Sequence, residues 1–295
     1  MALAFNFTYD DKAIREDLLD LIVNIDPEED QLYVGLAKHK ASQPYHQWLT
    51  DTLTAVGANA QKEGFDPAFA VRTNPTRVGN YTQIISAEFA VSDSERNSDT
   101  AGFKNRYTYE MNKAMLEWRR YAEYAIVRGS LVSGSGSTAR QMAGIFAQIT
   151  SLATNAASVS LSETILNNYL QNAWNSGGNV DMVLVGGTLK RRISVFTNTN
   201  TRFVDATTAS VNNTINVYDS DFGRVEIHKH RYVTIAGENP SVLGLQKDKW
   251  AIAHLDEPHY QEIPRTGYAS KGMIVGELTL EGLNQASSFA ATNLQ

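Results

Sequence analysis

The stretch "FKNRYTYEMNKAMLEWRRYAEYAIVR", residues 103–128, carries the longest helical pattern in the chain. It contains no glycine or proline, and Gly129 follows it, where a helix commonly ends. Apolar side chains recur in it at intervals of four and three residues, namely Met111, Met115, Trp118, Ala122 and Ala125. This spacing predicts a single helix of about 25 residues, roughly 38 Å long, with one buried stripe. Asp99 or Thr100 is the expected N-cap.

A helix of that length is unusual in a compact domain, where helices average about three turns. Its stripe of methionine and aromatic side chains is typical of a packed core rather than of a cofactor site. Arg119 and Glu123 stand four residues apart, and we expect them to pair on the outer side of the helix.

The segment before this helix predicts a projecting hairpin. Residues 81–91 alternate as a strand does, with Tyr81, Gln83, Ile85, Ala87, Phe89 and Val91 on one face and a more polar set on the other. The residues ahead of them are rich in glycine, proline and asparagine. Because the flanking sequence offers nothing to bury it, we predict that the hairpin reaches out from the body. Its open edges would invite pairing with another chain.

The N-terminal region reads as an arm. Leu18, Leu21, Ile22 and Ile25 lie at helical spacing, and Asp26-Pro27 ends the pattern. This short acidic helix is either a docking strap or a simple surface helix, and periodicity does not separate the two. Further along, Trp48 and Leu49 are expected to be buried, since large apolar groups gain most from leaving water.

The remainder of the chain reads as mixed α/β. A glycine-serine hinge after residue 130 leads to a small helix around Ile145. Ser160 and Glu163 fit a capping box for a helix that Gly177 ends, with Ile165, Tyr169 and Trp174 near one side. A buried strand and a helix follow over 180–198, then a polar loop over 198–212. Strands are expected at 214–219, 223–235, 250–255 and 273–280, with a loop over 257–272 and a polar tail.

Glu226, His228 and His230 form the one pattern that suggests a metal site. In an alternating strand they share a face, and two imidazoles with a carboxylate are suitable ligands for zinc or iron. Lys229 and Arg231 flank the histidines, which indicates an exposed strand. A solvated or inter-subunit polar face is therefore the preferred interpretation, with a metal site as the alternative.

Other apparent motifs do not hold. The triplet Asp221-Phe222-Gly223 matches kinases but has no accompanying kinase motifs and suits a turn. Gly186-Gly187 follows a strand without the three-glycine dinucleotide fingerprint. His254, near Asp256 and Glu257, could take part in proton transfer, but a surface loop is the preferred interpretation.

Composition narrows the function further. The chain has 295 residues, a net charge of −6, 42% hydrophobic residues and no cysteine. The negative charge argues against a dedicated nucleic-acid binder, and the lack of cysteine excludes disulfides and thiolate zinc sites. We find neither a signal peptide nor an apolar run of ~18 residues that could span a membrane. The sequence therefore predicts no active site and no cofactor, and its arm, hairpin and long helix are typical of a part that joins others.

In order along the chain, these elements resemble a tailed-bacteriophage major capsid protein with the Hong Kong 97-like fold. The stretches that carry the resemblance are "EDLLDLIVNIDPEED" (16–30), "HQWLTDTL" (46–53), "NAQKEG" (59–64), "VGNYTQI" (78–84), "MLEWRRYAEYAI" (115–126) and "KGMIVGELTLEGLNQASSFA" (271–290). Each is degenerate alone, but together and in order they are specific.

The resemblance implies an α+β fold with four parts. They are an N-terminal arm (1–58), an extended β-hairpin loop that lies over a neighbouring subunit (59–98), a peripheral domain with its spine helix (99–149 and 263–295) and a mixed α/β axial domain (150–262). On this mapping we expect inter-subunit contacts at Leu18, Leu21, Ile22, Phe65, Phe69, Arg72, Arg77, Tyr81, Arg119 and Glu123.

The function implied is that of a structural protein without enzymatic activity, which self-assembles into the icosahedral shell around phage double-stranded DNA. Its expected partners are many copies of itself in hexamers and pentamers, together with scaffolding, portal and decoration proteins, and packaged DNA held weakly. It would be assembled in the host cytoplasm and located in the virion, with no membrane contact. The alternatives are another phage structural part, such as a tail-tube or decoration protein, and a metal-dependent enzyme using Glu226, His228 and His230.

Overall fold

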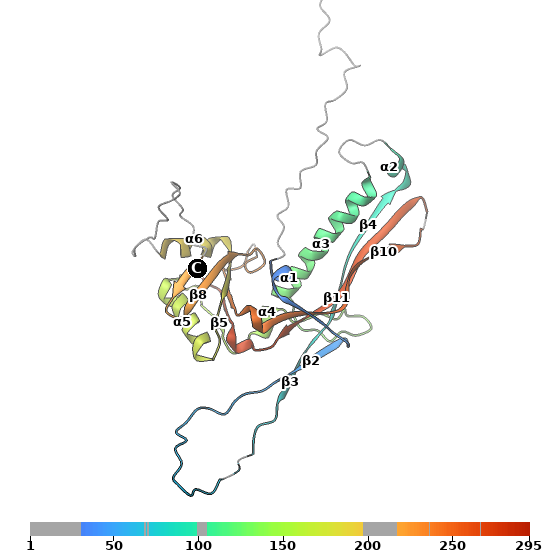
Figure 1. Ribbon diagram of the computed structural model, residues 1–295. Helices are drawn as coiled ribbons and strands as arrows, with labels where there is room; N and C mark the ends of the chain where they lie inside the picture. Colours follow the sequence, from blue (N-terminus) through green and yellow to red (C-terminus); the bar gives the residue numbers. More distant parts are fainter. Residues whose placement is uncertain are drawn as a thin grey trace, which may run out of the picture.

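The computed structural model describes residues 31–67, 69, 71–98, 105–196, 217–235, 237–265 and 267–295. Figure 1 shows a long helix, α3, running beside the strands β4, β10 and β11, with a unit that contains α5 and α6 at one end. A two-stranded hairpin, β2–β3, projects from the body. The predicted strap helix at 18–25 and the polar loop at 198–212 both lie outside the described residues.

The long helix forms as its sequence predicts. Helix α3 spans Arg106–Arg128, 23 residues, and the side chains of Trp118 and Ala122 are fully buried. Met111 and Met115 pack against the same core from partly buried positions. The N-cap is Asn105, whose side chain accepts hydrogen bonds from the backbone N–H groups of Tyr107 and Thr108, so the predicted cap at Asp99 or Thr100 is wrong. The buried stripe therefore fixes which side of α3 faces the sheet.

A four-stranded sheet, in the order β1-β10-β11-β4, lies against α3. Its strands are β1 (Ala37–Lys40), β10 (Trp250–Ile263), β11 (Ala269–Gly282) and β4 (Gln83–Ser92). Trp118 Nε1 donates to the carbonyl oxygen of Ile85 at 2.8 Å, which ties the helix to the sheet. The loop predicted over 257–272 is wrong, because most of it continues β10 and β11 as a long antiparallel pair. Its outer residues are exposed and polar, so the sequence resembled a loop although the backbone pairs.

A six-stranded sheet, in the order β5-β12-β9-β6-β8-β7, forms the second unit. Its strands are β5 (Ala153–Asn155), β12 (Phe289–Thr292), β9 (Val242–Leu245), β6 (Met182–Val185), β8 (Gly223–Lys229) and β7 (Val217–Ser220). Alternate residues of β6 enter different cores: Val183 and Val185 pack with helices α5 and α6, whereas Met182 and Leu184 join the core around α3. The expected polar tail is therefore wrong at β12, which is buried in this sheet.

The helices of this unit are α5 (Glu163–Asn175) and α6 (Gly187–Phe196). Helix α5 is capped by Ser162 and not by Ser160, and its buried face is Leu166, Leu170 and Ala173. Trp174, expected beside Ile165 and Tyr169, is instead 59% exposed. The remaining short elements are α1 (Gln31–Gly35), α2 (Asp93–Asn97), α4 (Ile145–Gln148), η1 (Lys247–Lys249) and η2 (Gln285–Ser287).

The hairpin begins earlier in the sequence than predicted. Strand β2 (Tyr45–Thr50) pairs with β3 (Thr76–Tyr81), and the loop between them, 51–75, has no helix or strand in its described residues. The expected alternation is confirmed over 83–91, but these residues belong to β4 in the four-stranded sheet and not to the projecting part, whereas Tyr81 ends β3. Leu49 is 67% exposed, so its predicted burial is wrong: the two-stranded hairpin has no layer to cover it.

Candidate functional site

The loop at the end of the hairpin presents large apolar side chains to water. Leu53, Val56 and Val71 are exposed at 99%, 103% and 101%, and Phe69 at 94%. Fully burying one such side chain is worth about 1.5–3 kcal/mol, a gain that the single chain leaves unused. Exposed apolar groups gathered on one segment mark an interaction surface. The loop 51–75 is therefore the main candidate site.

The residues predicted to contact neighbours fall into four groups, of which the last, Arg119 and Glu123, lies on α3. Phe65, Phe69 and Arg72 lie on the exposed loop. Arg77 is exposed on β3, and Tyr81 packs its ring against Tyr45 with 4.6 Å between the centroids. Leu18, Leu21 and Ile22 lie outside the described residues. Contact of any of these residues with another copy stays a prediction.

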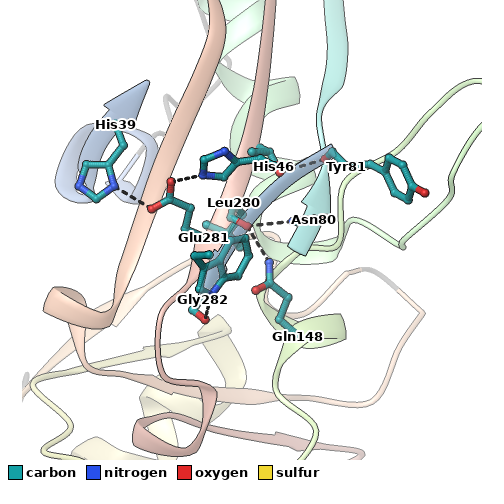
Figure 2. A network of polar contacts seen from close by, with 10 residues as sticks. His39, His46, Asn80, Tyr81, Gln148, Leu280, Glu281 and Gly282 are labelled. Atoms are coloured by element: carbon teal, nitrogen blue, oxygen red, sulfur yellow. Dashed lines mark hydrogen bonds and ion pairs between the residues drawn. The ribbon is translucent and has the colours of Figure 1, made fainter. Parts of the chain in front are cut away.

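One buried carboxylate joins the hairpin to the body. Glu281, near the end of β11, is 4% exposed. Its Oε1 lies 2.6 Å from His46 Nε2 on β2, and its Oε2 lies 2.7 Å from His39 Nδ1 on β1. Figure 2 shows the two imidazoles converging on this single side chain from either side. Three strands are thus held at one point at the root of the hairpin.

Neutral hydrogen bonds hold the other side of the root. Asn80, 1% exposed, donates to the carbonyl oxygens of Ala143 and Leu280 at 3.0 and 2.9 Å and accepts from Ala143 N at 2.8 Å. Figure 2 shows Asn80 and Gln148 meeting at the carbonyl of Leu280. A Cβ at Gly79 would lie 2.8 Å from the carbonyl oxygen of His46, so the two strands approach closely only with glycine there.

A second buried carboxylate, Glu123, corrects the expectation for the outer side of α3. Glu123 is fully buried, and its carboxylate accepts from the backbone N–H groups of Leu32 and Tyr33 at 2.8 and 2.7 Å. His230 Nε2 lies 2.8 Å away. Because His230 Nδ1 accepts from the N–H of Tyr232 at 3.3 Å, Nε2 carries the proton and donates to Glu123. Of the predicted pair, only Arg119 lies on the exposed side of the helix.

The histidines considered for a metal site do not converge. His230 is buried against Glu123, whereas His228 lies 3.2 Å from Glu226 on the exposed part of β8. Across the described ranges, no group of three or more His, Cys, Asp or Glu side chains is arranged to hold a metal ion. The ligand set Glu226, His228 and His230 is therefore wrong, because β8 ends at Lys229 and the chain turns His230 inward.

His254 is not on a surface loop. It lies on β10 and is 7% exposed, with its ring edge-on to Tyr33 at 5.9 Å between centroids. Its Nδ1 has no hydrogen-bond partner. Burial, and after it the charge of Lys38, lowers the pKa of His254, while Glu257 acts in the opposite direction. A neutral buried imidazole in this place supports packing rather than proton transfer.

A shallow groove of about 320 Å³ runs beside α3 along the edge strand β4. Ile84, Tyr121 and Tyr124 line it and are exposed at 61%, 52% and 45%. It is a second apolar surface of the body, distinct from the hairpin loop. In the part of the chain that the structure describes, no helix is long and apolar enough to cross a bilayer.

The described architecture, with its long helix on a narrow sheet and its projecting hairpin, is that of the capsid proteins of tailed phages. The capsid of the cyanophage A-1(L) is similar, with a TM-score of 0.71 at 14% identity over 95% of this chain and 97% of that one. The capsid of a native GTA particle has a TM-score of 0.68 at 12% identity, over 99% of this chain and 100% of that one. An encapsulin complex from Synechococcus elongatus has a TM-score of 0.61 at 8% identity, over 99% of this chain and 97% of that one. The same fold is therefore found in a phage capsid, in a GTA particle and in an encapsulin complex.

The family is settled by sequence. A family model described as SU10 major capsid protein matches residues 3–295, and the chain belongs to that family. It is a major capsid protein, as the resemblance implied, and not a tail-tube or decoration protein. A search of curated protein sequences found no significant match. The sequence motifs identified the family, whereas the buried carboxylates Glu123 and Glu281 had no signal in the sequence.

Proposed function

We propose that this chain assembles, in many copies arranged as hexamers and pentamers, into the icosahedral shell that encloses phage double-stranded DNA. It acts there as a structural protein and catalyses no reaction. The observation that carries the proposal is the loop 51–75, whose apolar side chains lie in water in the single chain. An extended loop of this kind gains its stabilisation only when it lies on another copy.

The four-part division expected from the resemblance is proposed here with a shifted hairpin. The extended loop comprises the hairpin from Tyr45 to Tyr81, and β4 belongs with α3 to the peripheral part. The six-stranded unit serves as the axial part around the symmetry axes. Phe65, Phe69, Arg72 and Arg77 are the proposed contacts of the hairpin with a neighbour, and the groove beside α3 is a surface of matching apolar character.

A subunit of a phage shell is expected to have partners besides its own copies. We expect scaffolding, portal and decoration proteins to bind the assembled shell, with assembly in the host cytoplasm and the finished protein in the virion. The net charge of −6 keeps contact with packaged DNA weak, because a polyanion gains little from releasing counterions on an acidic surface.

The test removes the loop while keeping the strands. Thr50 and Thr76 are paired across the hairpin, so an Asn-Gly turn in place of 51–75 closes it without disturbing the register. We expect a folded, monodisperse subunit that forms no closed shells in electron micrographs. The matched control is Val195→Ser, an exposed apolar residue on α6, which should leave assembly intact. Normal shells from the loop deletion would refute the proposal.

A further inference from the structure

The β2–β3 hairpin projects from the body, and the contacts where it joins the body set its direction. Within the described part of the chain, β2 and β3 pair only with each other, and every described side chain over 51–78 is exposed. We propose that Glu281, His39 and His46 form a releasable lock that sets the direction of the hairpin relative to the four-stranded sheet. This inference goes beyond shell formation and does not depend on it.

The two strands of the hairpin are held in different ways. Strand β3 runs into β4 with Thr82 as the one residue between them, and the buried Asn80 fixes it by three hydrogen bonds to the backbone. This side is the pivot. Strand β2 reaches the sheet through the imidazole of His46 on Glu281 and through Trp48 Nε1, which donates to the carbonyl oxygen of Gly282 at 3.2 Å. The β2 side is therefore the one that can come away while β3 stays in place.

Of the remaining contacts at the base, Thr279 Oγ1 on β11 donates to the carbonyl oxygen of Tyr81 at 2.9 Å and adds to the hold on β3. The N–H of Thr82 donates to the carbonyl oxygen of Pro44 at 2.8 Å, which closes the open end of the hairpin. The Thr82–Pro44 bond keeps β2 and β3 together as one body but does not fix the angle at which that body leaves the sheet. The angle is left to the contacts of Glu281 and Trp48 on the β2 side.

Water reaches the lock from one side. The side chain of His39 is 49% exposed and that of His46 is 18% exposed, whereas Glu281 is 5% exposed. Water can replace the His39 imidazole, and the carboxylate then still has His46 as a donor. Losing both donors would leave a buried carboxylate without partners, which is costly. The lock consequently opens in two steps, with His39 as the first contact to go.

The lock also connects two distant parts of the chain. His39 belongs to β1, which follows the N-terminal region, and His46 belongs to the hairpin, yet both bind the same carboxylate. A force on β1 that removes His39 leaves His46 and Trp48 as the side chains that hold the β2 side of the hairpin to β11. If the proposed function is right, contacts made by the arm and by the hairpin with neighbouring copies are coupled through Glu281.

The experiment measures the hairpin angle in single subunits. The chain has no cysteine, so Leu49→Cys on β2 and Asn112→Cys on α3 provide two unique positions for spin labels. Both positions are exposed, and both lie on regular elements rather than on the loop. We expect a narrow distance distribution by pulsed electron paramagnetic resonance. His46→Ala should widen it at least twofold and His39→Ala less, while Glu88→Gln, an exposed carboxylate on β4, should not change it.

The outcomes separate cleanly. Equal distributions in the parent, His46→Ala and His39→Ala would overturn the lock. His39 lies half exposed on an edge strand, so His39→Ala remains informative if His46→Ala does not fold. Because single subunits are measured, a failed lock leaves shell formation untouched, and shells from the loop deletion would refute the proposed function without refuting the lock.

Discussion

Two buried carboxylates in this chain are each held by imidazole, and they differ in what surrounds them. Glu123 and His230 have no exposed side-chain surface, and two backbone N–H groups complete the carboxylate's partners. Glu281 is buried as well, but one of its two histidines is half exposed. The first contact joins α3, α1 and the end of β8 inside the body, whereas the second holds the part that projects. Water therefore reaches the contact that holds the projecting part but not the contact inside the body.

The largest effect is expected at the sealed contact. Glu123→Ala removes the acceptor of three N–H groups in the core, and removing one partner of such a buried contact costs about 3–5 kcal/mol. Urea unfolding of the purified subunit measures the loss. The control is Glu117→Ala on the same helix, whose contact with Lys113 is 3.9 Å and more exposed, so it should change stability by less than ~0.5 kcal/mol. Similar losses for both variants would contradict the sealed junction.

A smaller loss is expected at the hairpin root. Glu281→Ala leaves His39 free to turn toward water, so we expect the free energy of unfolding to fall by about 1–3 kcal/mol. The same urea titration checks it. A loss equal to that of Glu123→Ala would remove the distinction between the two carboxylates.

His254 is a third buried imidazole and has no carboxylate partner, so the pH dependence of stability tests the comparison. Burial, followed by the charge of Lys38, lowers the pKa of His254, so the unfolded chain takes up a proton there more readily than the folded one. Stability should therefore fall as pH drops below the ordinary histidine value of about 6.5. His254→Leu should lessen this acid-side loss, measured as the unfolding midpoint at pH 7 and pH 5. His259→Leu, at an exposed position, should leave it unchanged.

The smallest effect on stability is expected at the loop itself. Replacing Leu53, Val56 and Val71 by serine removes apolar groups that touch only water, so the unfolding midpoint should move within the range of a surface change, about ±0.5 kcal/mol. Shell yield by sedimentation should nevertheless drop sharply. Unchanged yield, or a marked loss of stability in the single subunit, would show that this loop packs on its own chain.

The sequence pattern predicts some of these elements and not others. The stripe from Met111 to Ala125 and the alternation over 81–91 predicted α3 and β4, because their patterns match the period of the structure. The outer halves of β10 and β11 were missed because their residues are polar although their backbones pair. The spacing of Arg119 and Glu123 predicted that Glu123 lies on the outer side of the helix. This spacing does not reveal that His230 packs on that side.

The contacts at the root of the hairpin could not be predicted from the sequence, for a different reason. His39 and His46 lie 242 and 235 residues from Glu281, and only the strand order β1-β10-β11-β4 and the hairpin beside it bring them together. The candidate loop was partly predicted, as an outward-reaching segment, but its limits were placed too late. Composition did not reveal that β3 and β4 are separate strands divided at Thr82.

Thr50 and Thr76 form the last pair of the hairpin, so the length of the loop between them can vary separately from the fold. The described residues between Thr50 and Thr76 are exposed and lie outside the packed core, so insertions and deletions in this loop should leave the folding of the subunit unchanged. Each residue added to both sides of the loop extends its span by at most about 3.3–3.6 Å. If the loop lies on a neighbouring copy as proposed, a change in its length alters how far one subunit reaches across the next while the packed body of the subunit stays the same.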